Sequence, residues 1–121
     1  MRKILVIDDN SDICTLIDSF LSEKGYAVTT ATDGAAARAA MANTRFDLVI
    51  SDVVLYGERG IELAMLARAR NIPLLLMSGN PNAIEALYSE TADQFIAKPF
   101  RMTDMEAAIR DLLAPAQAKR A

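Results

Sequence analysis

The chain has 121 residues, of which 52% are hydrophobic and 24% are charged, which suits one soluble globular domain and argues against disorder. Its formal net charge is −3, which argues against nucleic acid as a direct partner, because such binding relies on neutralising phosphates with Lys and Arg. Histidine is absent, so the chain has no Ser-His or Cys-His nucleophile, no imidazole metal ligand and no phosphohistidine of its own.

The single cysteine, Cys14, cannot form an internal disulfide, so a reducing cytoplasm is the expected compartment. No apolar run approaches the roughly 20 residues that span a bilayer, and two acids follow the short apolar start, so it is no signal peptide. We therefore expect no membrane insertion. The natural-looking Met1 and the short tail indicate a complete chain, with a single domain over 1–121 that is ordered over about 2–114.

Strand-like and helix-like segments alternate along the chain. A strand is expected at about 3–7. The helix that follows, at about 11–24, has apolar residues at helical spacing, with Asn10 or Ser11 as its cap and Gly25 at its end. Asp33 is a candidate cap for an alanine-rich helix at about 34–43. The other expected elements are strands at about 26–31, 47–51, 72–77 and 93–97, a loop at 52–60, and helices at 61–70, 82–90 and 103–113.

Regular alternation of five strands with helices predicts an α/β fold, a doubly wound parallel sheet with helices on both faces. The first, third and fourth strands are continuous apolar runs, as central strands covered on both faces should be. The second strand contains Thr29 and Thr30, and the fifth contains Asp93 and Gln94, so both suit an edge. This favours the flavodoxin-like (βα)5 order 2-1-3-4-5, with its switch point between the first and third strands.

Polar residues follow four of these strands: Asp8 and Asp9 the first, Asp52 the third, Ser78 the fourth and Lys98 the fifth. The carboxyl ends of parallel strands share one edge, where ligands bind. Each residue also has a plainer interpretation, since Asp8 and Asp9 could cap a helix, Asp52 and Ser78 could begin turns, and Lys98 could be a solvated charge. Such residues at four strand ends that share one edge are more than coincidence predicts.

Three carboxylates held together repel one another, and a divalent hard cation relieves the repulsion. Mg²⁺ prefers oxygen ligands, so we expect Asp8 or Asp9 to bind it together with Asp52. A free oxygen of Asp52 can then attack a phosphoryl group, as carboxylates that form aspartyl phosphates do. Lys98 can neutralise one phosphoryl oxygen, and the Ser78 hydroxyl can donate to another.

This order of residues resembles the receiver domain of response regulators, the phosphoacceptor module of two-component signalling. The match runs from Arg2 to Leu113, and it includes Gly60 and the Lys98-Pro99 pair. The resemblance implies that Asp8 and Asp9 bind Mg²⁺, that the backbone carbonyl of Val54 is a further ligand, and that Asp52 is phosphorylated.

For the remaining positions, the resemblance implies that Ser78 moves to the phosphate on activation and that Phe95 changes rotamer with it. A static, part-buried Phe95 is the plainer alternative. The peptide bond before Pro99 is expected to be cis. The sequence departs from the family at Tyr56, where proline is common, and at Val54 and Asn80, positions that tune hydrolysis of the phosphate. An apolar Val54 is poorly suited to orient an attacking water, which favours a long-lived phosphoryl group.

The implied function is that of a stand-alone receiver, phosphorylated on Asp52 by a histidine kinase or histidine phosphotransfer protein that docks near the helix at 11–24. Its output would be a protein-binding face formed by 82–90, 93–97 and 101–113, and it would not turn over an external substrate. Two alternatives stay open: a degenerate or constitutive interaction module, and a receiver excised from a hybrid histidine kinase. An aspartyl-phosphate phosphatase is disfavoured, because Val54 stands where that chemistry needs a second carboxylate. A nucleotide binder is disfavoured because a glycine-rich phosphate loop is missing.

Overall fold

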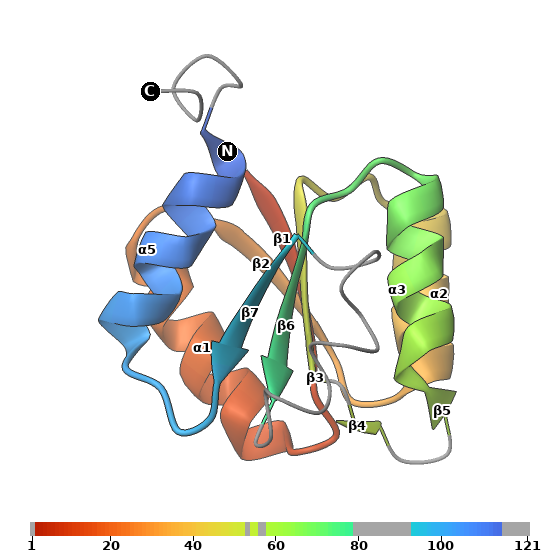
Figure 1. Cartoon of the computed structure of the whole chain (residues 1–121), viewed down its shortest axis with the longest axis horizontal. Coiled ribbons are helices and arrows are strands. Elements are labelled where there is room, and N and C mark those ends of the chain that lie inside the picture. Colours follow the sequence, from red (N-terminus) through yellow and green to blue (C-terminus); the bar gives the residue numbers. More distant parts are fainter. Residues whose placement is uncertain (1, 53, 56–57, 79–92, 115–121) are drawn as a thin grey trace.

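The computed structural model describes residues 2–52, 54–55, 58–78 and 93–114. Its main sheet has five parallel strands in the order β2-β1-β3-β6-β7 (Figure 1). This is the predicted flavodoxin-like order, because β6 and β7 are the fourth and fifth strands of this sheet. The strands are β1 (Lys3–Ile7), β2 (Ala27–Ala31), β3 (Leu48–Asp52), β6 (Leu74–Ser78) and β7 (Gln94–Ala97).

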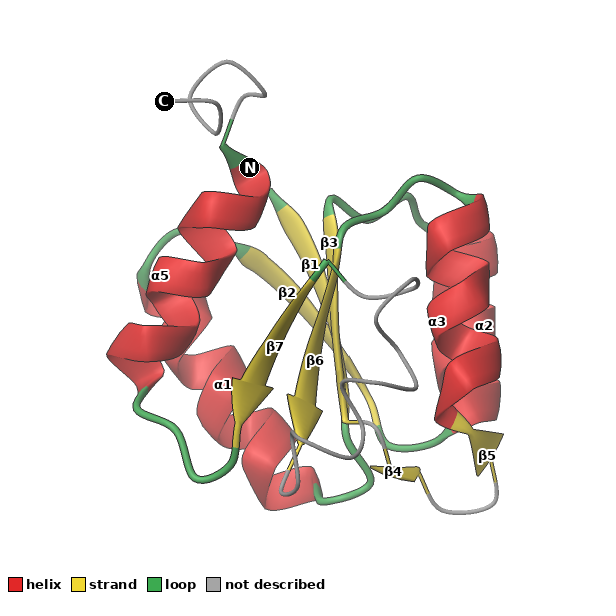
Figure 2. Cartoon of the chain, in the orientation of Figure 1, coloured by secondary structure: helices red, strands yellow, loops and turns green. Residues whose placement is uncertain are grey.

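Helices cover both faces of the sheet, with α1 and α5 on one side and α2 and α3 on the other (Figure 2). The helix expected at 82–90 lies outside the described residues. No helix in the described part of the chain is long and apolar enough to cross a bilayer. The helices are α1 (Ser11–Glu23), α2 (Gly34–Asn43), α3 (Gly60–Ala69) and α5 (Met102–Leu113).

Burial follows the position of each strand in the sheet. Every residue of β6 is buried, whereas Thr29 and Thr30 of the edge strand β2 are exposed. Alternate residues of the central strands face opposite layers, so that Leu5 packs toward α2 and α3 and Ile4 packs toward α1 and α5. Apolar surface buried in both layers holds the domain together.

Polar side chains at the helix starts explain where α1 and α2 begin. Asn10 Oδ1 accepts hydrogen bonds from the backbone N–H groups of Asp12 and Ile13, at 2.9 and 3.3 Å, so Asn10 is the cap of α1. The interpretation of Asp8 and Asp9 as caps is therefore wrong. Asp33 Oδ1 caps α2 in the same way, accepting from Ala36 N at 2.7 Å.

The segment 52–60 differs from the expected loop. Two short strands, β4 (Val54–Leu55) and β5 (Glu58–Arg59), pair antiparallel, with Leu55 opposite Glu58. The sequence expectation rested on the glycines alone. Strands of two residues carry no period from which they could be recognised.

Two aspartates form hydrogen bonds with the amino ends of neighbouring strands in the sheet. Asp47 N donates to Lys3 O, and Asp47 Oδ2 accepts from Lys3 N, both at 2.8 Å. Asp93 does the same to Leu74, with distances of 2.9 and 2.8 Å. Each aspartate thus binds both backbone polar groups of a strand's first residue.

Candidate functional site

Three carboxylates meet at the carboxyl ends of the central strands. Asp8 and Asp9 follow β1, Asp52 ends β3, and one oxygen of each lies within 4.8 Å of the others. Asp8 is buried, Asp52 is partly buried and Asp9 is exposed. The neighbouring registers of β1 and β3, with Ile7 opposite Ser51, place these acids side by side.

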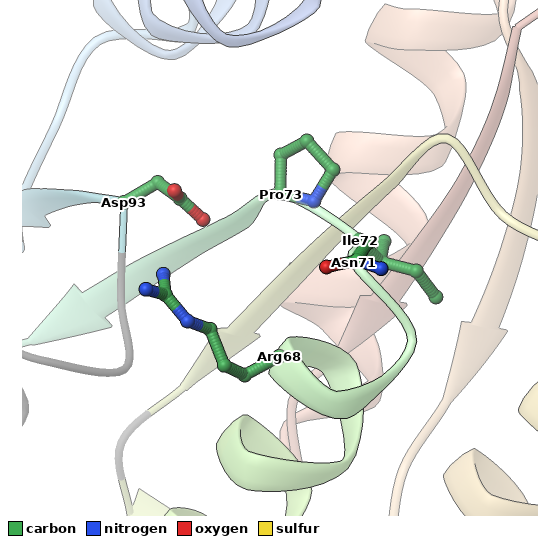
Figure 3. Close-up of a pocket in the computed structure, with 5 residues that line it drawn as sticks. All are labelled: Arg68, Asn71, Ile72, Pro73 and Asp93. Atoms are coloured by element: carbon green, nitrogen blue, oxygen red, sulfur yellow. The ribbon is translucent and has the colours of Figure 1, made fainter.

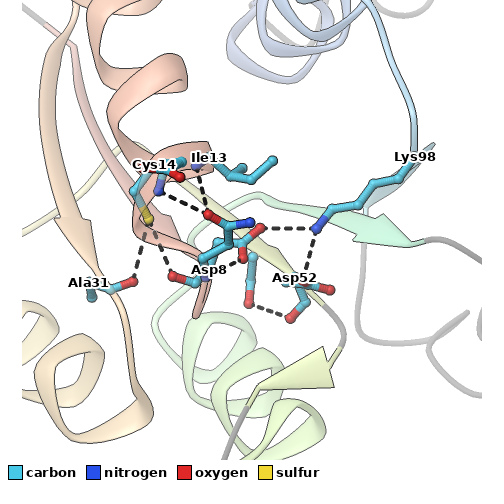
Figure 4. Close-up of polar contacts among 9 residues, drawn as sticks. Asp8, Ile13, Cys14, Ala31, Asp52 and Lys98 are labelled. Atoms are coloured by element: carbon cyan, nitrogen blue, oxygen red, sulfur yellow. Dashed lines mark hydrogen bonds and ion pairs between the residues drawn. The ribbon is translucent and has the colours of Figure 1, made fainter.

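Lys98 joins two of these carboxylates. Its Nζ lies 3.0 Å from Asp8 Oδ2 and 2.9 Å from Asp52 Oδ2 (Figure 4). Burial lowers the pKa of Lys98, but the hydrogen bonds to Asp52 and Asp8 outweigh it, so the net result is a raised pKa. The ammonium is therefore charged at neutral pH and offsets part of the negative charge in the site.

Backbone groups and the Cys14 thiol form hydrogen bonds with Asp8. Its Oδ1 accepts from Asn10 N at 2.9 Å, and its own N–H donates to Ala31 O at 3.1 Å. The Cys14 thiol donates to Asp8 O at 3.3 Å and approaches Ala31 O at 3.9 Å. Burial and the nearby Asp8 charge raise the pKa of Cys14, which keeps the thiol protonated as a donor.

This contact of Cys14 was not predicted from the sequence. Cys14 lies on the same buried face of α1 as Ile17 and Leu21. That helical spacing was the available signal that Cys14 points inward. Nothing local indicated that it would contact the carbonyl of Asp8.

Ser78 and Phe95 lie in adjacent strands near the same edge. Ser78 ends β6 with its side chain buried, and its carbonyl accepts from Lys98 N at 2.8 Å. Phe95 is partly buried and packs on the α2/α3 side of the sheet, opposite Leu76. The peptide bond between Lys98 and Pro99 is cis.

The structure gives less information on three other positions that the sequence singled out, Val54, Tyr56 and Asn80. Val54 lies in β4, two residues after Asp52, and its role as a carbonyl ligand stays a prediction. Tyr56 and Asn80 lie outside the described residues.

The donor set fits Mg²⁺. Asp8, Asp9 and Asp52 offer hard carboxylate oxygens in one cluster, and the cluster contains no thiolate or imidazole that would favour a softer metal. Partial neutralisation by Lys98 leaves a site that is still acidic, with three carboxylates against one ammonium.

An apolar hollow of about 370 Å³ adjoins the acidic site. Lys98 lies in its wall, and the exposed Leu16 of α1, with 56% of its surface accessible, lies at its side. An exposed apolar patch beside a charged site is characteristic of protein contact surfaces. Its lining consists of Ile13, Leu16, Ile17, Lys98, Pro99, Phe100 and Met102.

Comparison with known proteins identifies the family. The family model of the response regulator receiver domain matches residues 4–110, and the chain belongs to that family. It is 36% identical over 115 residues to the regulatory protein VanRB of Enterococcus faecalis, covering 92% of this chain and 52% of that protein. It is 31% identical to the alkaline phosphatase synthesis transcriptional regulatory protein PhoP of Bacillus subtilis, covering 93% and 48%.

Solved structures agree with this assignment. The response regulator TrrA of Thermotoga maritima, in complex with Mg²⁺-BeF, superposes with a TM-score of 0.85 at 30% identity, covering 93% of this chain and all of that one. The chemotaxis response regulator CheY4 of Vibrio cholerae gives a TM-score of 0.85 at 28% identity, covering 93% and 99%.

The chain spans about half the length of the curated relatives it matches, between 49% and 52% for the first six. MtrA of Mycobacterium tuberculosis, 28% identical over 112 residues, is named a DNA-binding response regulator. The expectation that nucleic acid is not a direct partner therefore gains no support from these relatives.

Proposed function

We propose that this receiver domain accepts a phosphoryl group on Asp52 in a Mg²⁺-dependent reaction. The observation that carries the proposal is the position of Lys98 Nζ, 2.9 Å from Asp52 Oδ2, beside a cluster of three carboxylates. A carboxylate nucleophile next to a fixed cation is what transfer to an aspartate requires. The Mg²⁺–BeF complex of the similar TrrA supports the same assignment.

In the proposed step, a carboxylate oxygen of Asp52 attacks the phosphorus of a phosphohistidine or a small phosphodonor. The new P–O bond forms as the bond from phosphorus to the donor breaks, and the electron pair of that bond leaves with the donor. Asp8, Asp9 and Asp52, with the Val54 carbonyl, would hold Mg²⁺, which when bound neutralises charge on the carboxylate and phosphoryl oxygens.

Lys98 would supply a second positive charge, and the Ser78 hydroxyl would donate to a phosphoryl oxygen. A general base is not needed, because Asp52 attacks as a carboxylate. Attack by water on the phosphorus later restores Asp52 and releases phosphate, so the chain modifies and demodifies itself without turning over an external substrate. We propose that Phe95 changes rotamer with Ser78 when the phosphate is present.

For the phosphodonor, we propose a histidine kinase or histidine phosphotransfer protein in the cytoplasm, docked by a helix at the apolar hollow. The supporting observation is the exposed Leu16 beside a hollow whose wall contains Lys98. A partner helix seated there would bring its histidine to the acidic edge of the sheet. Apolar anchors in such a groove are the usual basis of helix recognition.

For the output, we propose a stand-alone domain over 1–121 that signals through a protein-binding face of β7 and α5 together with residues 82–90. The relatives favour a second candidate, a receiver that controls an attached DNA-binding region, because they are about twice as long as this chain. The length of the protein made in its native cells, measured by immunoblot, separates the two candidates.

The test of phosphorylation is intact-mass analysis after incubation with Mg²⁺ and a small phosphodonor. We expect one added phosphoryl group in the wild type and none in Asp52→Asn. Asp12→Asn, which removes an exposed acid from the first turn of α1, is the matched control and should still be modified. An unmodified wild type, or an adduct that persists in Asp52→Asn, would refute the proposal.

A further inference from the structure

Three arginines near the carboxyl ends of α2 and α3 have no carboxylate partner among the described residues, whereas other arginines do. Arg2, Arg38 and Arg110 lie 4.0, 3.3 and 3.3 Å from the carboxylates of Asp47, Glu62 and Glu106. The three arginines near the helix ends are Arg45, Arg68 and Arg70. Among the described residues, no carboxylate oxygen lies within 4.0 Å of their guanidinium nitrogens.

Two of these arginines line one hollow of about 230 Å³, here called the α2–α3 hollow. Arg70 is fixed in its wall, because Nη1 donates to Met41 O. A guanidinium has five N–H donors, so with respect to the described residues Arg70 retains four and Arg45 has all five for a ligand. The lining contains no Asp or Glu and consists of Met41, Ala42, Asn43, Thr44, Arg45, Arg70 and Ile72.

A neighbouring hollow of about 240 Å³ shares Ile72 but has a different charge pattern. Arg68 and Asp93 extend toward it from opposite sides (Figure 3). The Asp93 carboxylate disfavours an anion there. Arg68 therefore contributes long-range positive charge to this end of the molecule, and the α2–α3 hollow is the better place for an anion.

The helix dipoles work against an anion at this end, because carboxyl ends of helices carry partial negative charge. Arg70 offsets part of it by binding one of the last carbonyls of α2, that of Met41. The guanidinium groups of Arg45 and Arg70 each carry a full positive charge, whereas a helix end carries only a partial negative charge. Two full charges outweigh the residual dipole.

We propose that the α2–α3 hollow binds a small phosphate-bearing anion. Arginine forks bind phosphate oxygens in pairs, and Arg45 and Arg70 both line the same hollow. Its volume lies below the roughly 300–1,000 Å³ of pockets for drug-sized ligands, so a diphosphate, free or at the end of a nucleotide, is the expected size. The site lies at the end of the sheet opposite Asp52 and does not depend on phosphorylation.

The test titrates inorganic diphosphate into the full chain without Mg²⁺, with binding followed by calorimetry and by amide chemical shifts. We expect shifts concentrated at 41–45 and 70–72. Arg45→Ala should weaken binding about tenfold or more, the loss of one charge-assisted contact. Arg110→Ala makes the same change in net charge on α5 and should bind as the wild type does.

Arg70→Lys retains the charge but loses the fork, and we expect a weakening of severalfold. Adenosine diphosphate that binds more tightly than diphosphate would assign the site to a nucleotide, and equal affinities would assign it to the phosphates alone. Shifts confined to residues near Asp52, or equal affinities for Arg45→Ala and the wild type, would overturn the proposal. Thermal unfolding checks that each variant is folded.

Discussion

Lys98 and Asp8 form an ion pair across 90 positions of sequence, with Nζ 3.0 Å from Oδ2. The Asp8 side chain is 1% exposed, so the lysine is the counter-ion of a buried carboxylate. The same nitrogen contacts Asp52. A single cation therefore links the proposed metal ligand to the proposed phosphoacceptor.

Replacing Lys98 should affect two measurements in opposite directions. In Lys98→Met the ammonium no longer competes for the Asp8 and Asp52 oxygens, so Mg²⁺ affinity should rise severalfold. Phosphorylation by a small phosphodonor should slow by about a hundredfold, because a charge aimed at the phosphoryl group is lost. Lys3→Met, at an exposed lysine, is the control. A variant that weakens Mg²⁺ binding would contradict the competition between the two cations.

The stability provided by Lys98 should vanish only in strong alkali. Its folded-state pKa is raised above the ordinary lysine value of 10.5, so the contribution is fully present below the unfolded value and is lost as pH rises through the folded value. The difference in unfolding free energy between wild type and Lys98→Met should thus be constant from neutral pH to about 10. Urea titrations at several pH values measure it, and a loss of the difference near neutrality would contradict the raised pKa.

Mg²⁺ should stabilise the folded chain through Asp8. Binding to the folded state alone adds about 2.7 kcal/mol at a hundredfold excess over Kd. Asp8→Asn should lose most of this gain, because Asp8 is the buried member of the cluster. Asp12→Asn should keep it. Melting temperatures with Mg²⁺ and with a chelator decide the matter, and an undiminished metal effect in Asp8→Asn would remove Asp8 from the ligands.

Asn10→Ala should cost about 1 kcal/mol of stability, the usual value of a helix cap. Its side chain accepts from two backbone N–H groups of α1. Ser11→Ala, next to it and exposed, should change stability little. Equal losses in urea unfolding for the two variants would show that the cap is not the source of the effect.

The Cys14 thiol should be inert in the folded protein. It is buried and its pKa is raised, so thiol reagents should modify it only when the chain unfolds. Cys14→Ala should cost about 1 kcal/mol, since the hydrogen bond to Asp8 O is lost, whereas Cys14→Ser keeps a donor and should cost less. Rapid labelling under native conditions would contradict the buried position.

The sequence predicted the strand order and the helix caps because these depend on local composition. The unbroken apolar run of β6 and the mixed composition of β2 separate centre from edge, and Asp33 precedes its helix at capping distance. The shared edge of Asp8, Asp52 and Lys98 followed from the parallel topology alone.

The sequence could not predict contacts that join distant positions. Asp47 binds Lys3 across 44 residues, and Asp93 binds Leu74 across 19. No local period indicates such a bond. The same holds for the thiol of Cys14 on the carbonyl of Asp8, because a buried helix residue gives no sign of which backbone group it will touch.

The hydrogen bonds of Asp47 and Asp93 at the amino ends of the strands have a consequence for the site at the carboxyl ends. A slip of one residue between paired strands would turn every side chain to the opposite face. Asp47 fixes the start of β1 beside β3, and Asp93 fixes the start of β6 beside β7. These two aspartates therefore fix the register of the paired strands. The meeting of Asp8, Asp52 and Lys98 thus depends on acids that take no part in the chemistry.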